Sequence, residues 1–105
     1  LLKSVEVDNN GVYKEWYPGF KQLKFTGVQD KEGKRNGVWK MYSESGTELS
    51  ITEYKHGKKD GISVVYHPNG VLHYRGEYSN DEKSGLWKVY DTNGVLQSEK
   101  DYSKE

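Results

Sequence analysis

The sequence predicts an all-β fold, in which tandem hairpin repeats of about 24 residues form one elongated, open-ended, single-layer antiparallel sheet. Three observations support this prediction. The 105 residues include 9 Tyr and 3 Trp but no Ala, and Tyr and Val, which are frequent here, favour strands over helices. A short pattern that begins with Gly and ends with Tyr recurs at a fixed step along the chain. Asn-Gly pairs, the strongest short signal for a hairpin turn, recur at the same step.

The repeated pattern covers most of the chain. Residues 37–42, 61–66 and 85–90 each begin with Gly and end with Tyr, at a step of 24 residues. Residues 11–17 are a poorer copy with one extra residue, as is common for end repeats. We therefore expect a single domain over residues 1–105, with units at approximately 11–36, 37–60, 61–84 and 85–105.

Each unit is expected to contain two strands and two kinds of turn. The short turns are Ser45-Gly46, Asn69-Gly70 and Asn93-Gly94. We expect these to be two-residue type I′ turns, which need a positive φ at both residues. The longer, charged loops lie at residues 31–36, 56–60 and 80–84. No window of the chain shows a sustained helical period, so the connections are expected to join strands only.

Two-residue turns would fix how the strands pair. Three Gly–Tyr pairs would then face each other: Gly37 with Tyr54, Gly61 with Tyr78, and Gly85 with Tyr102. We expect each Tyr ring to lie across the bare glycine backbone and to restore the packing that glycine lacks. The alternative is that these glycines only end strands.

The same register sorts the side chains onto two faces. The Trp face, defined by Trp39 and Trp87, would also carry Met41, Tyr54, Val65, Leu72, Tyr74, Tyr78, Val89, Leu96 and Tyr102. The Tyr face would carry the ladder of Tyr42, Tyr66 and Tyr90. In the second unit Glu48 stands where the later units have Leu, so either that hairpin slips by one residue or the face changes there.

The repeated residues resemble a known family. The pattern Gly-x-Trp-x-x-Tyr-x-x-Asn-Gly-x-Leu, followed by Tyr, spans Gly85 to Leu96 with Tyr102. It resembles the MORN repeat (membrane occupation and recognition nexus), and more closely its bacterial variant class. The resemblance implies a gently rolling sheet without a closed core, which binds proteins or, in some eukaryotic members, lipid. It also implies the antitoxin or immunity half of a toxin pair, a role commonly given to bacterial variant proteins. Ser63 departs from the pattern where Trp is expected.

Composition excludes several classes of protein. The 16 basic and 16 acidic side chains cancel, whereas dedicated nucleic-acid binders usually carry a basic excess. The absence of Cys excludes disulfides and thiolate metal sites. No apolar run approaches the ~18 residues of a membrane span, and no signal peptide is visible. We expect a cytoplasmic protein; because Leu1 is not an initiator Met, a removed signal is the alternative.

The sequence offers no convincing catalytic site. His67 and His73 flank a turn, but the expected register points them to opposite faces, which argues against a metal site or an acid–base pair. No Ser or Thr is marked as a nucleophile by an adjacent base, and no pair of acids stands apart from ordinary salt-bridge partners. We therefore expect a protein that is not an enzyme and that binds neither a cofactor nor a metal.

We expect a protein-binding scaffold that neutralises a partner, in the family-based version a toxin, by occlusion. The candidate anchors are Trp39, Tyr42, Tyr66, Trp87 and Tyr90, because aromatic residues are favoured in interfaces. The alternative is that these rings only stack on one another to hold the sheet.

Two rival functions remain open from the sequence. The first is a membrane-associated module that binds anionic lipid through a basic loop stripe of Lys34, Arg35, Lys58, Lys59 and Lys83; the alternative for this stripe is a solvated row of loops. The second is self-association through the open edge strands.

Overall fold

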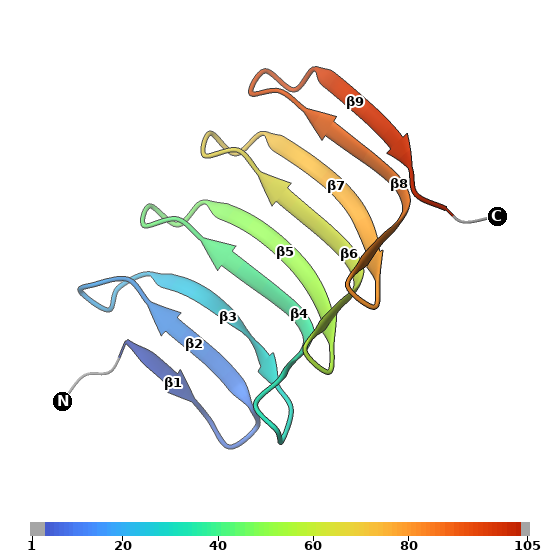
Figure 1. The fold of residues 1–105 in the computed structure, drawn as a ribbon. Coiled ribbons are helices and arrows are strands. Elements are labelled where there is room, and N and C mark those ends of the chain that lie inside the picture. The colour runs from blue at the N-terminus through green and yellow to red at the C-terminus, as the bar shows by residue number, and fades with distance from the viewer. Residues whose placement is uncertain (1–3, 104–105) are drawn as a thin grey trace.

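The computed structural model describes residues 4–103. It contains one nine-stranded antiparallel sheet in which each strand pairs with the next along the chain (Figure 1). The strands are β1 (Val5–Val7), β2 (Val12–Trp16), β3 (Leu23–Gln29), β4 (Arg35–Tyr42), β5 (Glu48–Lys55), β6 (Lys58–Tyr66), β7 (Leu72–Ser79), β8 (Glu82–Tyr90) and β9 (Leu96–Asp101). The extents of 50 × 32 × 13 Å correspond to a single layer, since stacked sheets alone would be about 10 Å apart. The expected all-β, open-ended fold is confirmed, and β1 and β9 form its two edges.

The two kinds of turn are the reverse of the expectation. The Asn-Gly turn between β6 and β7 is a three-residue loop, in which Gly70 N–H donates to His67 O at 2.8 Å and Gly70 takes a φ of 87°. The charged connection between β5 and β6 instead turns on two residues, His56 and Gly57, with φ of 49° and 82°. Pro68 explains the first result, because proline favours the start of a type I turn, which is completed by a left-handed glycine.

A capping side chain produces the same three-residue loop before β9. The carboxylate of Asp91 accepts the N–H groups of Asn93 and Val95, both at 2.9 Å, and Gly94 N–H donates to Asp91 O. Such local bonds stabilise a type I turn and compete with the two-residue turn that Asn-Gly alone predicts.

A β-bulge follows each three-residue loop and restores the expected register further along the hairpin. Tyr66 pairs with Leu72 whereas Val65 pairs with Tyr74, so His73 is the extra residue. Beyond the bulge the expected pairs are confirmed, for example Gly61 with Tyr78.

The bulges also correct the sorting of the faces near the turns. Leu72 and Leu96 lie opposite Tyr66 and Tyr90, so they belong to the Tyr face and not to the Trp face. Glu48 lies opposite Tyr42 in the same way. The second hairpin therefore neither slips nor changes face; it carries a charged residue at the position of the two leucines.

The glycines that face tyrosines have a different role from the one expected. Gly37, Gly61 and Gly85 have φ of 86°, 113° and 65°, in the region that favours glycine. Each lies where the following strand gains two residues over its neighbour, a register shift at every joint between hairpins. A Cβ added at Gly37 would meet nothing within 4 Å, so no ring covers it. The backbone geometry of the bulge, and not a Tyr ring, requires these glycines.

The core of the sheet consists of two indole rings. Trp39 and Trp87 are 4% and 5% exposed and are the buried hydrophobic residues within the described part of the chain. Each ring lies flat over a glycine of the preceding strand, Gly27 or Gly76, where an added Cβ would come within 2.2 Å or 2.1 Å of the indole. The apolar interior is thus confined to the Trp face, at the β3/β4 and β7/β8 joints.

Candidate functional site

The Trp face has three joints between hairpins, and the middle one differs from the other two. At β7/β8 the indole N–H of Trp87 donates to Glu77 O at 3.1 Å, and at β3/β4 that of Trp39 donates to Val28 O at 2.9 Å. At β5/β6 the equivalent residue is Ser63, which is buried and pairs with Thr52. Their hydroxyl oxygens lie 3.3 Å apart. A pair of hydroxyls thus replaces an indole over a glycine.

Aromatic rings surround the indole at the outer joint. The ring centroids of Tyr74, Tyr78 and Tyr102 lie 5.7, 5.1 and 6.2 Å from that of Trp87. The ammonium of Lys83 lies 4.9 Å from the same ring. This is a cluster of edge-to-face and cation–π contacts, each worth about 0.5–1.5 kcal/mol beyond the area it buries.

The middle joint keeps part of this surround but lacks its centre. A hollow of about 210 Å³ lies there. The side chains of Trp39, Tyr54 and Tyr74 line it, and the hydroxyls of Thr52 and Ser63 lie among them. An apolar cavity of about 150 Å³ holds a benzene molecule, so this hollow has room for one aromatic ring.

The charges around the hollow are positive. Arg35 donates to the Tyr54 hydroxyl at 3.2 Å and lies 4.5 Å from the Trp39 ring, and Lys59 lies 4.9 Å from the Tyr78 ring. Within residues 4–103 neither cation forms a salt bridge, and no acidic residue lines the hollow.

Burial is also expressed in the titration of the wall. Burial raises the pKa of Tyr74, and the neighbouring Tyr78 raises it further, whereas Lys59 lowers it. Tyr74 therefore remains a neutral hydroxyl beside the cation across the physiological range.

The opposite face presents apolar groups to solvent. Val38, Ile62 and Leu86 repeat every 24 residues and are 47%, 36% and 47% exposed. We refer to these three residues as the aliphatic column. Each lies opposite an acid on the neighbouring strand: Glu53, Glu77 and Asp101 respectively. Tyr42, Tyr66 and Tyr90 lie on the same face towards the other ends of the strands, partly buried.

The family model that describes the MORN repeat variant matches residues 35–56, 59–80 and 83–104. The chain belongs to the MORN repeat variant family. Its repeats are modules that bind proteins or membranes. No curated protein and no solved structure matches the chain significantly. The irregular first unit that we expect at 11–36 lies almost wholly before the matched residues.

The five candidate anchors do not form one surface of the MORN sheet. Trp39 and Trp87 are buried under their own neighbours on the Trp face. Tyr42, Tyr66 and Tyr90 form a ladder on the other face. The two tryptophans therefore stabilise the joints, which leaves the tyrosines as the accessible members.

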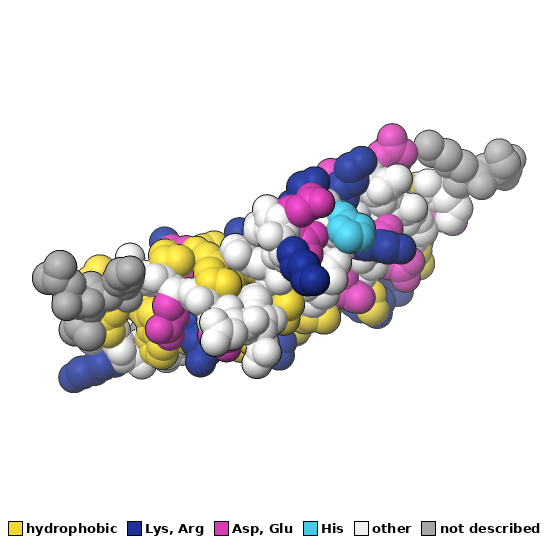
Figure 2. Space-filling model, turned by 90° about the horizontal axis from the view of Figure 1, so that it is seen from below, with side chains coloured by type: hydrophobic (Ala, Val, Ile, Leu, Met, Phe, Trp, Pro, Cys, Tyr) yellow, Lys and Arg dark blue, Asp and Glu magenta, His cyan; other side chains and the backbone are white. Residues whose placement is uncertain are grey.

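The candidate basic stripe divides in the same way. Arg35, Lys59 and Lys83 lie at the starts of β4, β6 and β8 and stack on aromatic rings. Lys34 instead pairs with Glu32 at 3.2 Å, and Lys58 lies opposite Lys55 at the β5/β6 turn. Figure 2 shows basic and acidic side chains interspersed on the side it presents.

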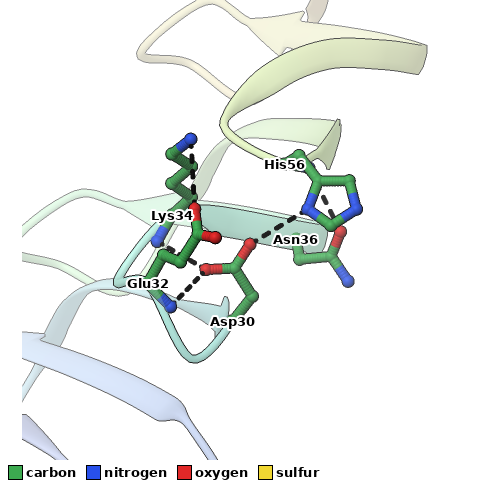
Figure 3. Close-up of polar contacts among 5 residues, drawn as sticks. All are labelled: Asp30, Glu32, Lys34, Asn36 and His56. Carbon is green, nitrogen blue, oxygen red and sulfur yellow. Dashed lines mark hydrogen bonds and ion pairs between the residues drawn. The ribbon is translucent and has the colours of Figure 1, made fainter.

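Contacts between loops tie successive MORN repeats together. Asp30 accepts the N–H groups of Glu32 and Lys34, both at 3.0 Å, and its second oxygen lies 3.2 Å from Nδ1 of His56 in the next repeat (Figure 3). The amide of Lys34 contributes most to lowering the pKa of Asp30, and His56 and Glu32 lower it further. The backbone N–H of His56 also donates to Asn36.

The prediction that His67 and His73 point to opposite faces is wrong. Their rings stack with centroids 4.2 Å apart, because the bulge at His73 turns this side chain towards the loop. Nε2 of His67 also lies 2.9 Å from the carbonyl oxygen of Tyr90. Within residues 4–103 no group of three or more His, Cys, Asp or Glu side chains could hold a metal ion. The same residues contain no helix long and apolar enough to cross a membrane.

Sequence reasoning missed two features. The aliphatic column was visible as the residue that follows each repeated Gly, but a strand interior was assumed to bury it. The hollow was signalled by Ser63 in place of Trp; only the structure shows that Thr52 replaces the partner glycine.

Proposed function

We propose that this MORN repeat chain is a non-enzymatic scaffold that binds another protein on its Tyr face. The observation that carries the proposal is the aliphatic column, in which Val38, Ile62 and Leu86 are exposed in a row across three hairpins. An exposed apolar row flanked by polar residues is typical of an interaction surface. The face measures 50 by 32 Å at its extents, which leaves room for the roughly 800 Å² that a stable partner covers.

Electrostatics favours a protein over an anionic membrane as the partner. Glu53, Glu77 and Asp101 lie directly beside the column and would repel anionic headgroups. The same acids would attract a basic rim on a protein and align it along the strands. The basic side chains that a membrane would need are largely stacked on rings or paired on the other face or in the loops.

The finer version of the proposal is an antitoxin or immunity protein that neutralises a toxin by occlusion. A one-layer sheet that carries its apolar column across several hairpins can cover the active surface of a partner without any chemistry of its own. This version predicts that growth arrest by the captured partner is relieved when the scaffold is co-expressed.

Affinity capture from the native host, followed by mass spectrometry, tests the scaffold proposal. The wild-type chain should retain a protein that the double variant Ile62→Glu, Leu86→Glu loses. Val95→Glu is the matched control, because Val95 is a still more exposed aliphatic residue in the loop before β9. Retention of the same protein by the double variant would contradict the proposal.

Two further measurements distinguish the rival functions. Flotation with phosphatidylserine vesicles at physiological salt should leave the chain in the bottom fraction, and co-flotation would favour the membrane module. Sedimentation should show a monomer; concentration-dependent assembly would favour pairing through β1 or β9, since open edge strands are the usual route to such pairing.

A further inference from the structure

We propose that the hollow at the β5/β6 joint binds an aromatic side chain that is flanked by acidic residues in a partner protein. The site lies on the Trp face, opposite the aliphatic column, and rests on the proposed function only in that its occupant belongs to a protein. The inference comes from three features of the joint: an absent ring, uncompensated positive charge and a hydroxyl floor.

The first feature is the absence of a ring that the repeat holds elsewhere. A step of 24 residues relates Tyr54 to Tyr78, Tyr78 to Tyr102 and Lys59 to Lys83. The three later residues surround the Trp87 indole, so the middle joint retains the surround while Ser63 leaves the central position empty of a ring. An aromatic side chain from outside would meet ring edges and a cation in the arrangement that Trp87 meets within the chain.

The second feature is the charge. Arg35 and Lys59 line the hollow without a carboxylate partner, while Lys40, the third basic residue of the lining, pairs with Glu48 at 3.9 Å. Arg35 is held in place by the Tyr54 hydroxyl and the Trp39 ring, so its remaining donors are preorganised towards solvent. Acidic residues beside the incoming ring would form charge-assisted contacts with both cations.

The third feature is the floor. Thr52 occupies the position at which the outer joints have glycine, so an incoming ring cannot descend as far as Trp87 does. It would instead lie above the Thr52 and Ser63 hydroxyls, which can rotate to donate to or accept from a polar group on the ring. An indole N–H or a phenol hydroxyl fits this floor better than a purely apolar ring.

Titration of the ¹⁵N-labelled chain with the peptide acetyl-Glu-Glu-Trp-Glu-Glu-amide tests the site. We expect amide shifts to concentrate at Thr52, Ser63 and Tyr74. A peptide with Ala in place of its Trp, and one with Lys in place of its Glu residues, should each bind at least about tenfold more weakly, since each loses one of the two recognition elements.

Two variants locate the binding. Thr52→Gly combined with Ser63→Trp fills the hollow with the chain's own ring and should abolish the peptide-induced shifts. Lys59→Gln should weaken binding about tenfold, whereas Lys88→Gln on the Tyr face should leave it unchanged, because Lys88 pairs with Glu99 away from the hollow.

The inference is overturned if the wild-type chain shows no peptide shifts at the hollow, if the filled variant binds as the wild type does, or if the basic peptide binds as tightly as the acidic one. Each variant is first shown to retain the dispersed amide spectrum of the folded sheet. Because the peptide assay does not involve Ile62 or Leu86, its failure is separable from failure of the scaffold proposal.

Discussion

The β5/β6 and β7/β8 joints have the same backbone but different interiors. Both have a register shift of two residues at a glycine with positive φ, Gly61 in one and Gly85 in the other. One joint then contains an indole over a bare backbone, and the other contains two hydroxyls above which a hollow remains. The backbone alone therefore aligns successive hairpins, and the side chains decide whether a joint is filled or open.

The two interiors are exchanged as pairs of residues. An added Cβ at Gly76 would lie 2.1 Å from the Trp87 ring, so Trp on one strand requires Gly on the other. Ser63 removes that requirement, and Thr52 then supplies a β-branched residue that strands favour. The comparison teaches that a single irregular repeat can trade stability for an accessible site without disturbing its neighbours.

The largest expected effect comes from emptying a filled joint. Trp87→Ala should lower the free energy of unfolding by about 3–5 kcal/mol, because a buried indole and its hydrogen bond to Glu77 O are lost. Ser63→Ala at the open joint should cost at most about 1 kcal/mol, the value of one hydroxyl hydrogen bond. Urea unfolding followed by circular dichroism measures both. Similar costs at the two joints would refute the distinction between them.

A smaller effect is expected from converting the open joint into a filled one. Ser63→Trp alone should destabilise the sheet by about 1–3 kcal/mol, because Thr52 occupies the place that the ring needs. Thr52→Gly alone should also destabilise it, by about 1 kcal/mol, through the loss of a strand-favouring side chain.

Together the two changes should be more stable than either alone by at least about 1 kcal/mol beyond additivity. A double-mutant cycle in urea measures this coupling. The same cycle at Thr47 and Ser98, which lie in different hairpins, should be additive and serves as the control. Additivity at Thr52 and Ser63 would show that the Trp–Gly pairing is coincidental.

The period of the repeat predicted the fold, but the turns show where sequence reasoning fails. The Gly–Tyr register was correct away from the turns, because a three-residue loop and the bulge after it compensate each other in length. The local errors came from Asp91 and Pro68, whose effects on turn type outweigh that of Asn-Gly. Leu72 and Leu96 were assigned to the wrong face for this reason alone.

The candidate site was less predictable than the fold. Aromatic content indicated Trp39 and Trp87 as anchors, yet burial depends on Gly27 and Gly76, which lie 12 and 11 residues earlier and carry no signal of their own. The departure of Ser63 from the repeat was visible in the sequence. Its meaning was not, because it depends on a partner strand that only the register identifies.

The smallest expected effect concerns the loop contact between the second and third hairpins, at the margin of the open joint. Hydrogen bonds from Lys34 and Glu32, together with the nearby His56, hold the pKa of Asp30 below its ordinary value of 3.8. A carboxyl whose pKa is lowered on folding stabilises the fold at pH values above its unfolded pKa. That contribution is lost as the pH falls through the folded pKa. Asp30→Asn keeps an oxygen that can accept both backbone N–H groups but cannot carry the charge that His56 faces.

The variant should therefore be slightly less stable than the wild type near neutral pH, and the difference should disappear under strongly acidic conditions, below the folded pKa. Urea midpoints measured for both proteins across this range test the prediction, with Glu32→Gln as a control whose carboxylate pairs only with Lys34. A difference that persists unchanged into acid would mean that the amide fails to replace the turn hydrogen bonds. The loop would then be held by its local geometry, and the charge facing His56 would contribute nothing to the open joint.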